Sequence, residues 1–193
     1  MTQGVMFAQK SNSNYDPKKE ITYDGKRYHY FNNYLTIGAG RAHNDNIKGL
    51  QFAGAADFNF HIQQYYFQAG ALLAGNNFGN YNNVQGHLCY GKRFEQNKFN
   101  LAGYLGGSYS AMNQSYEDSI AHYKFVNALG LYACMQATYK FKYDLGIGLA
   151  FFADFNKAQS LFGVRLELYF SGAYRRAIRG EQNLNQQDET YQH

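Results

Sequence analysis

Residues 50–61, LQFAGAADFNFH, alternate between two kinds of side chain at every second position. One set is apolar and contains the three phenylalanines of the stretch, whereas the other set is mixed and carries Gln51, Asp57, Asn59 and His61. Because successive side chains of a β-strand point to opposite faces, a period of two predicts a strand, and an amphipathic helix would repeat about every 3.6 residues instead. The stretch therefore predicts a β-strand with one apolar face and one more polar face.

The same period continues on both sides of this stretch, from residue 30 to residue 172. Eight runs alternate in this way, and their apolar faces contain Leu35 and Ile37, Phe58, Tyr65 and Phe67, Leu88 and Tyr90, Leu101 and Leu105, Leu129 and Leu131, Leu149 and Phe151, and Leu166 and Leu168. We expect short connections at 62–64, 95–98 and 141–142, and longer polar ones at 43–46, 76–83, 112–122 and 156–160. The pattern predicts an all-β fold, an eight-stranded antiparallel up-and-down barrel with both ends on one side.

The less apolar face decides between a soluble barrel and a membrane barrel. In a soluble barrel such as a lipocalin, this face would meet water and carry long charged side chains. Here it consists mostly of Gly, Ala, Ser, Asn and Gln, which suits the narrow interior of an eight-stranded barrel. The apolar face carries aromatic residues near the strand ends, as membrane barrels do in their interfacial girdles: Tyr65, Tyr90, Phe94, Tyr139, Phe141, Tyr143 and Phe170. The sequence therefore predicts a transmembrane β-barrel.

The composition agrees with a strand-rich membrane protein. The 193 residues include 19 Tyr, 16 Phe and a single Pro, and aromatic residues favour strands whereas proline interrupts their ladders. No run of 18 or more apolar residues is present, which excludes a membrane-spanning helix. The net charge of +4 is spread along the chain, so a nucleic-acid partner is not expected.

Polar segments flank the predicted barrel, which we place at residues 30–172. Residues 1–29 carry charges without sustained periodicity and are predicted to form a periplasmic arm, and residues 173–193 are predicted to form a polar periplasmic tail. Residues 1–8 are similar to the end of a secretory signal peptide but lack its basic start, so an artificial leader is an equal alternative.

The segment 30–172 resembles the small outer-membrane β-barrel proteins of the OmpX and OmpW class. The resemblance is one of pattern, and it includes a last strand whose apolar residues alternate and end in an aromatic: Val164, Leu166, Leu168 and Phe170. It implies a location in the bacterial outer membrane, contact with outer-membrane lipids and recognition of this strand by the barrel-assembly machinery. The Tyr- and Asn-rich composition also resembles outer-membrane proteins of Bacteroidetes. Many such barrels stop at the terminal aromatic, whereas this chain continues to His193, which suggests a separate role for the tail.

Seven charged residues fall on the face that we predict to line the barrel interior: Asp57, Arg93, Lys124, Lys140, Asp144, Arg165 and Glu167. Burial of an unpaired charge costs several kcal/mol, so charges inside a narrow barrel must be paired or hydrated. The favoured interpretation is a salt-bridge network that plugs the lumen and fixes the strand register. A polar path for a small solute is the alternative, although eight strands leave little room for an open channel.

Catalytic and metal sites have little support in the sequence. The stretch 110–122 contains Ser115, Glu117, Asp118, Ser119 and His122, the residue types of a hydrolytic site such as that of a lipid-modifying enzyme, but polar loops ordinarily carry these residues. His61 and His87 are expected to point into the lumen. The only cysteines, Cys89 and Cys134, form no metal-binding motif and are predicted to be buried thiols rather than a disulfide. No metal or cofactor is expected.

The remaining features concern partners. Arg175, Arg176, Arg179 and Glu181 follow the last predicted strand and are suited either to lipid headgroups or to a periplasmic or membrane partner. Small residues on the lipid-facing side would allow close packing against another barrel: Gly54, Ala56, Ala69, Ala71, Gly103 and Gly107. The leading hypothesis is a non-enzymatic accessory subunit of a larger outer-membrane complex. A narrow conduit of the OmpW kind is the alternative, and a lipid-modifying enzyme ranks third.

Overall fold

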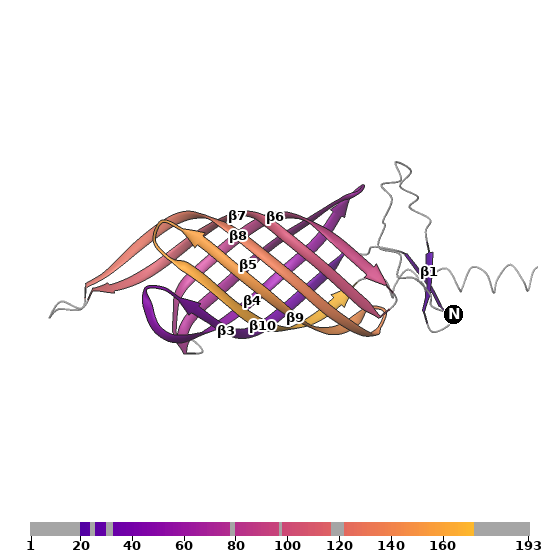
Figure 1. The fold of residues 1–193 in the computed structure, drawn as a ribbon, viewed down its shortest axis with the longest axis horizontal. Coiled ribbons are helices and arrows are strands. Elements are labelled where there is room, and N and C mark those ends of the chain that lie inside the picture. The colour runs from indigo at the N-terminus through magenta and orange to yellow at the C-terminus, as the bar shows by residue number, and fades with distance from the viewer. Residues whose placement is uncertain are drawn as a thin grey trace, which may run out of the picture.

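The computed structural model describes residues 20–23, 26–29, 33–77, 80–96, 98–116 and 122–171. Eight of its strands form a closed antiparallel barrel (Figure 1). Their bounds are β3 Tyr34–Asn44, β4 Ile47–Ile62, β5 Tyr65–Asn77, β6 Asn80–Gln96, β7 Phe99–Tyr116, β8 His122–Lys142, β9 Leu145–Asn156 and β10 Ser160–Ser171. The predicted fold class is confirmed. Within the described residues, no helix is long and apolar enough to cross a membrane.

Pairing of the first and last barrel strands closes the sheet. Each strand pairs with its sequence neighbours, and β10 also pairs with β3, from Leu161 opposite Asn44 to Ser171 opposite Tyr34. The ends of the barrel segment therefore lie together, as an even number of strands requires. In hydrocarbon, every backbone polar group needs an internal partner, and closure provides one because it leaves no sheet edge.

The strands at the end opposite to Tyr34 and Ser171 are longer than the sequence suggested. The predicted loop 43–46 contains only a two-residue turn at 45–46, because β3 and β4 continue to that point. β6, β7 and β8 contain 17, 18 and 21 residues, whereas a membrane-spanning strand needs only about 9–11. The β7–β8 hairpin consequently projects beyond its neighbours (Figure 1). The sequence did not predict these strand extensions because their residues are polar. A hydrogen-bonded strand ladder that extends into water needs no apolar face.

The predicted sidedness holds along the barrel strands. Large apolar side chains face outward and are exposed on all eight strands, for example Ile37, Phe58, Tyr90, Leu105, Met135, Leu149 and Leu168. The alternate positions are buried in the lumen. One aromatic girdle residue was assigned wrongly: Tyr143 is 1% exposed, because it lies in the turn between β8 and β9 and not in a strand, so the alternation does not apply to it.

A separate two-stranded sheet precedes the barrel in sequence. β1 (Glu20–Tyr23) and β2 (Lys26–His29) pair antiparallel, with Glu20 opposite His29. The sequence predicts only a polar arm here, because four-residue strands are too short for a period of two to stand out. The barrel strands begin at Tyr34 and end at Ser171, and the periplasmic roles of 1–29 and 173–193 stay predictions.

The closing register generates a cross-linking prediction. Leu168 lies directly opposite Ile37, and both side chains face outward. In a chain with Cys89 and Cys134 replaced by alanine, the pair Ile37→Cys and Leu168→Cys is expected to form a disulfide on mild oxidation, because Cα atoms of directly opposed residues lie within disulfide range, about 4.5–5.5 Å apart. The shift in gel mobility after oxidation measures this. Cysteines at 37 and 166, two residues out of register, are the control. Preferential cross-linking of that pair would contradict this register, and failure of both pairs to cross-link would contradict the closure.

Candidate functional site

The barrel interior is the candidate site, because it gathers most of the charged and polar side chains that the structure describes. Buried residues from all eight barrel strands fill it, including large side chains such as Arg165, Tyr132, Tyr169 and Lys140. They form three clusters along the barrel. We call them the central cluster, the terminal cluster near Tyr34 and Ser171, and the distal cluster near the opposite end.

Arg165 is the hub of the central cluster. Its guanidinium donates to Asp57 of β4 through Nη2, and its Nε donates to Oε1 of Glu167 at 2.7 Å. Its Nη1 donates to the hydroxyl of Tyr132 at 3.2 Å. All these groups are buried, so the guanidinium has replaced its hydration shell with two carboxylates and a phenol. The planar fork of arginine suits this arrangement, which spans β4, β8 and β10.

His87 and a glycine complete the central cluster. Nε2 of His87 lies 3.0 Å from Oδ1 of Asp57, and its ring stacks on Tyr132 with the centroids 4.0 Å apart and the planes at 18°. Gly70 of β5 lies beneath these groups. A Cβ added there would collide with the carboxylate of Asp57 and lie 2.8 Å from Nε2 of His87. The absence of a side chain at Gly70 therefore makes room for this contact.

The terminal cluster joins two cations to one carboxylate. Nη2 of Arg93 lies 2.9 Å from Oε2 of Glu95, and Nζ of Lys140 donates to Oε1 of the same carboxylate. Arg93 also donates to Oδ1 of Asn100 at 2.5 Å and to the hydroxyl of Tyr169 at 3.3 Å. Aromatic rings cover the cations: the Arg93 guanidinium lies 4.6 Å from the Tyr34 centroid, and Lys140 Nζ lies 4.5 Å from that of Tyr143. Such contacts stabilise desolvated cations.

The distal cluster surrounds Asp154 of β9. Its Oδ1 accepts a hydrogen bond from Ser108, and its Oδ2 accepts from Ser110 at 3.3 Å and from Nδ2 of Asn156 at 2.8 Å. Hydroxyl and amide donors therefore satisfy this buried carboxylate.

The structure brings together five of the seven predicted lumen charges, Asp57, Arg93, Lys140, Arg165 and Glu167, in the central and terminal clusters. Asp144 lies in the turn between β8 and β9, where the strand alternation used for the prediction does not apply. Lys124 belongs to β8 and lies opposite Gln114, but the structure does not describe its side chain.

Sequence reasoning missed Glu95 and Asp154. Glu95 follows Arg93 by two residues and so shares its face, but it was assigned to a turn because β6 was expected to end earlier. Asp154 continues the inward alternation of Gly148 and Ala150 on β9 but is not among the seven predicted lumen charges. Extending the alternation of β6 by one step finds Glu95.

Other candidate residues have simpler positions. Cys89 and Cys134 are free and buried, as predicted. His61 lies near the end of β4, with its ring 3.0 Å from the side-chain oxygen of Asn33. In the described part of the chain, no group of three or more His, Cys, Asp and Glu side chains is placed to hold a metal ion.

Two sets of predicted residues lie wholly or partly outside the part of the chain that the structure describes. The side chains of Ser115 and His122 are not described, and neither are residues 117–121, so the hypothesis of a hydrolytic site is not tested there. The tail residues Arg175, Arg176, Arg179 and Glu181 also lie outside the described residues. The four residues of the predicted assembly strand, in contrast, all face outward on β10: Val164, Leu166, Leu168 and Phe170.

The clusters fill the barrel with charge-assisted hydrogen bonds. In the central and terminal clusters three cations, Arg93, Lys140 and Arg165, face three carboxylates, Asp57, Glu95 and Glu167. The pairs Lys140–Glu95 and Arg165–Asp57 join different strands, so they oppose sliding of one strand past another. Removal of one member would leave its partner charged and buried, which costs about 3–5 kcal/mol.

An eight-stranded closed antiparallel barrel with an apolar outer wall and a filled polar interior is the fold of the small transmembrane β-barrels of bacterial outer membranes. The predicted resemblance to this class is confirmed at the level of the fold, and the predicted outer-membrane location agrees with it.

Three solved structures have this fold. Neisserial surface protein A matches with a TM-score of 0.54 and 11% identity, over 72% of this chain and 96% of that one. The N-terminal barrel domain of Pseudomonas aeruginosa OprF matches with a TM-score of 0.55 and 8% identity, over 72% and 97%. Ail, the attachment invasion locus protein of Yersinia pestis, matches with a TM-score of 0.51 and 10% identity, over 72% and 95%. No protein-family model and no curated protein matches the chain.

The central cluster generates a stability prediction. Arg165→Leu would leave Asp57 and Glu167 without their cation, and we expect the free energy of unfolding to fall by about 3–5 kcal/mol. Urea titration of the barrel in lipid vesicles, followed by circular dichroism, measures the change. Arg41→Leu is the matched control, because Arg41 is exposed on the outer wall, and we expect it to have a small effect. Equal stabilities of the two variants would contradict the proposed importance of the cluster.

Proposed function

We propose that this protein is a non-enzymatic structural barrel of the outer membrane that acts as an accessory subunit of a larger membrane complex. The observation that carries the proposal is a patch of small residues on the outer wall, which offers a partner a smooth surface. The patch consists of Gly54, Ala56, Ala69, Ala71, Gly86 and Gly107.

Strand register makes the patch continuous. Ala56 lies opposite Ala71, and Ala71 lies opposite Gly86, so three small residues of β4, β5 and β6 form one row. An added Cβ would meet nothing within 4 Å at Gly86 or Gly107, which shows that the space outside both is open. Without a hydrophobic driving force in lipid, association depends on close van der Waals packing, for which small residues are suited.

The filled lumen supports a structural role over that of a conduit. The terminal and central clusters fill the barrel with paired charges and aromatic rings, and moving a solute past them would require the ion pairs of Arg93 and Arg165 to break. This leaves the outer wall and the ends of the barrel for interactions. The same argument makes the OmpW-like conduit the weaker alternative.

The proposal includes the partners inferred from sequence. Outward Val164, Leu166, Leu168 and Phe170 give β10 the alternation suited to the barrel-assembly machinery during insertion. Arg175, Arg176, Arg179 and Glu181 would meet lipid headgroups or a periplasmic part of the complex. Deletion of residues 175–193 separates these roles, because a partner held by the tail would then be lost while the barrel still inserts.

Co-purification with a patch variant tests the proposal. We expect the protein, extracted from native outer membranes in mild detergent, to retain a stoichiometric membrane protein that mass spectrometry identifies. Ala71→Phe should weaken the binding of this protein about tenfold, the effect of about 1.4 kcal/mol, and so lower its recovery, because a large side chain would hold the surfaces apart.

Leu149→Phe is the matched control for this experiment. Leu149 is also exposed on the outer wall, but β9 is four strands from β5 in a barrel of eight, so it lies on the opposite side. Recovery should remain unchanged in this variant. A barrel that is reproducibly free of partners, or a partner equally retained by Ala71→Phe, would overturn the assignment.

A further inference from the structure

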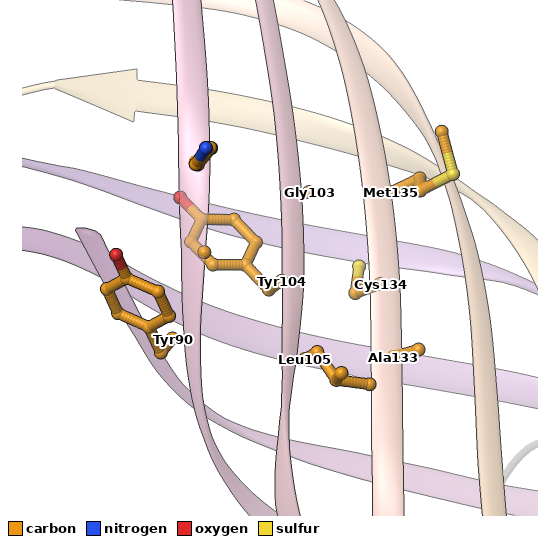
Figure 2. Close-up of a pocket in the computed structure, with 9 residues that line it drawn as sticks. Tyr90, Gly103, Tyr104, Leu105, Ala133, Cys134 and Met135 are labelled. Atoms are coloured by element: carbon orange, nitrogen blue, oxygen red, sulfur yellow. The ribbon is translucent and has the colours of Figure 1, made fainter. Parts of the chain in front are cut away.

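The outer wall also has an apolar depression outside the patch, on β6, β7 and β8 (Figure 2). Its floor is Gly103, at which an added Cβ would meet nothing within 4 Å. Tyr90, Leu105 and Met135, labelled in Figure 2, surround this position with exposed apolar side chains. The depression therefore exists because Gly103, an outward position of β7, has no side chain to fill the space between Tyr90, Leu105 and Met135.

Aromatic contacts with β5 hold Tyr90 in place at one side of this depression. The ring of Tyr90 lies edge-on to Phe67, with the centroids 5.8 Å apart, and tilted against Tyr65 at 6.1 Å. Both contacts are with β5, on the side away from Gly103. On the other side, Met135 lies directly opposite Gly103 in the β7–β8 register. An unbranched methionine side chain adapts its shape to a neighbouring chain.

A cation adjoins the depression. Lys92 lies opposite Gly103 in the β6–β7 register, is exposed, and belongs to the lining. It stands between Tyr90 and Phe94 on β6, so it lies within the band of aromatic residues near the terminal end of the barrel. A lysine at this depth extends its ammonium towards the headgroups while its methylenes stay against the apolar wall.

The exposed charged side chains described on the barrel strands all have the same sign. Among barrel residues with described side chains, the exposed charges on strands are Arg41, Lys92 and Lys142, all of them cations, and no carboxylate of these strands faces outward. Lys92 is the one of these that lines the depression. The ligand that fits an apolar groove with a cation at its side is an amphiphile with an anionic head.

We propose that Lys92 and the Gly103 depression form a binding site for one anionic phospholipid. One acyl chain lies over Gly103, between Tyr90 and Met135, and the phosphate accepts a hydrogen bond from the Lys92 ammonium. The site is separate from the small-residue patch, so it stands whether or not that patch binds a protein.

Native mass spectrometry tests the site directly. The full chain, purified in detergent, is titrated with palmitoyl-oleoyl phosphatidylglycerol, and in parallel with the zwitterionic phosphatidylcholine of the same chains. We expect one phosphatidylglycerol molecule to bind more tightly than further copies. Lys92→Gln should weaken this first binding about fivefold, the effect of about 1 kcal/mol for one lysine near a lipid phosphate, and Lys92→Arg should retain it.

Substitutions of lipid-facing residues separate the groove from general lipid coating. Gly103→Leu should weaken the first binding event as much as Lys92→Gln does, whereas Gly107→Leu, at the equally open glycine four residues along β7, should not. Lys142→Gln controls for loss of an exposed lysine outside the groove. Equal binding of the two lipids, a graded series without a distinct first site, or unchanged binding in Lys92→Gln would each overturn the proposal.

Discussion

The structure depends on one constraint, the need of every backbone amide and carbonyl in hydrocarbon for a hydrogen-bond partner within the protein. Antiparallel ladders provide these partners for all strands except the two at the edges, and pairing of β10 with β3 provides them for the edges. Closure with eight strands then fixes the width of the barrel. The interior of such a barrel is just wide enough for side chains to fill it, so the inward residues must pack against one another.

Packing in a narrow polar interior explains the ion-pair clusters. Arg165 needs Asp57 and Glu167. Glu167 follows it by two residues on β10, whereas Asp57 of β4 comes into contact because β4 and β10 both neighbour β3. Gly70 leaves the space that Asp57 and His87 occupy. The outer wall obeys the opposite rule: it carries apolar side chains, and the exposed charges among its described strand residues are cations, which suit the phosphates of a bilayer.

The sequence was sufficient to predict which face of each strand is apolar, because a period of two follows directly from strand geometry. It also placed Arg93, Lys140 and Arg165 in the lumen. The pairing of these residues was not predictable: Arg165 and Asp57 are 108 residues apart, and only the register of three strands brings them together. Turn residues were a second source of error. Tyr143 and Asp144 continue the apparent alternation of their neighbours, yet they lie in a turn that strand periodicity does not describe.

The most direct test of this account is the electrical conductance of the purified barrel in a planar lipid bilayer. A lumen filled by the central and terminal clusters predicts no conductance steps above the leak of the bare bilayer. The double variant Arg165→Gly and Arg93→Gly, which removes a large cation from each of the two clusters, is expected to produce small, unstable steps and shows that the barrels are inserted. Reproducible open-channel steps from the unmodified protein would contradict the account, because a continuous water path would then have to run past Arg165 and Arg93.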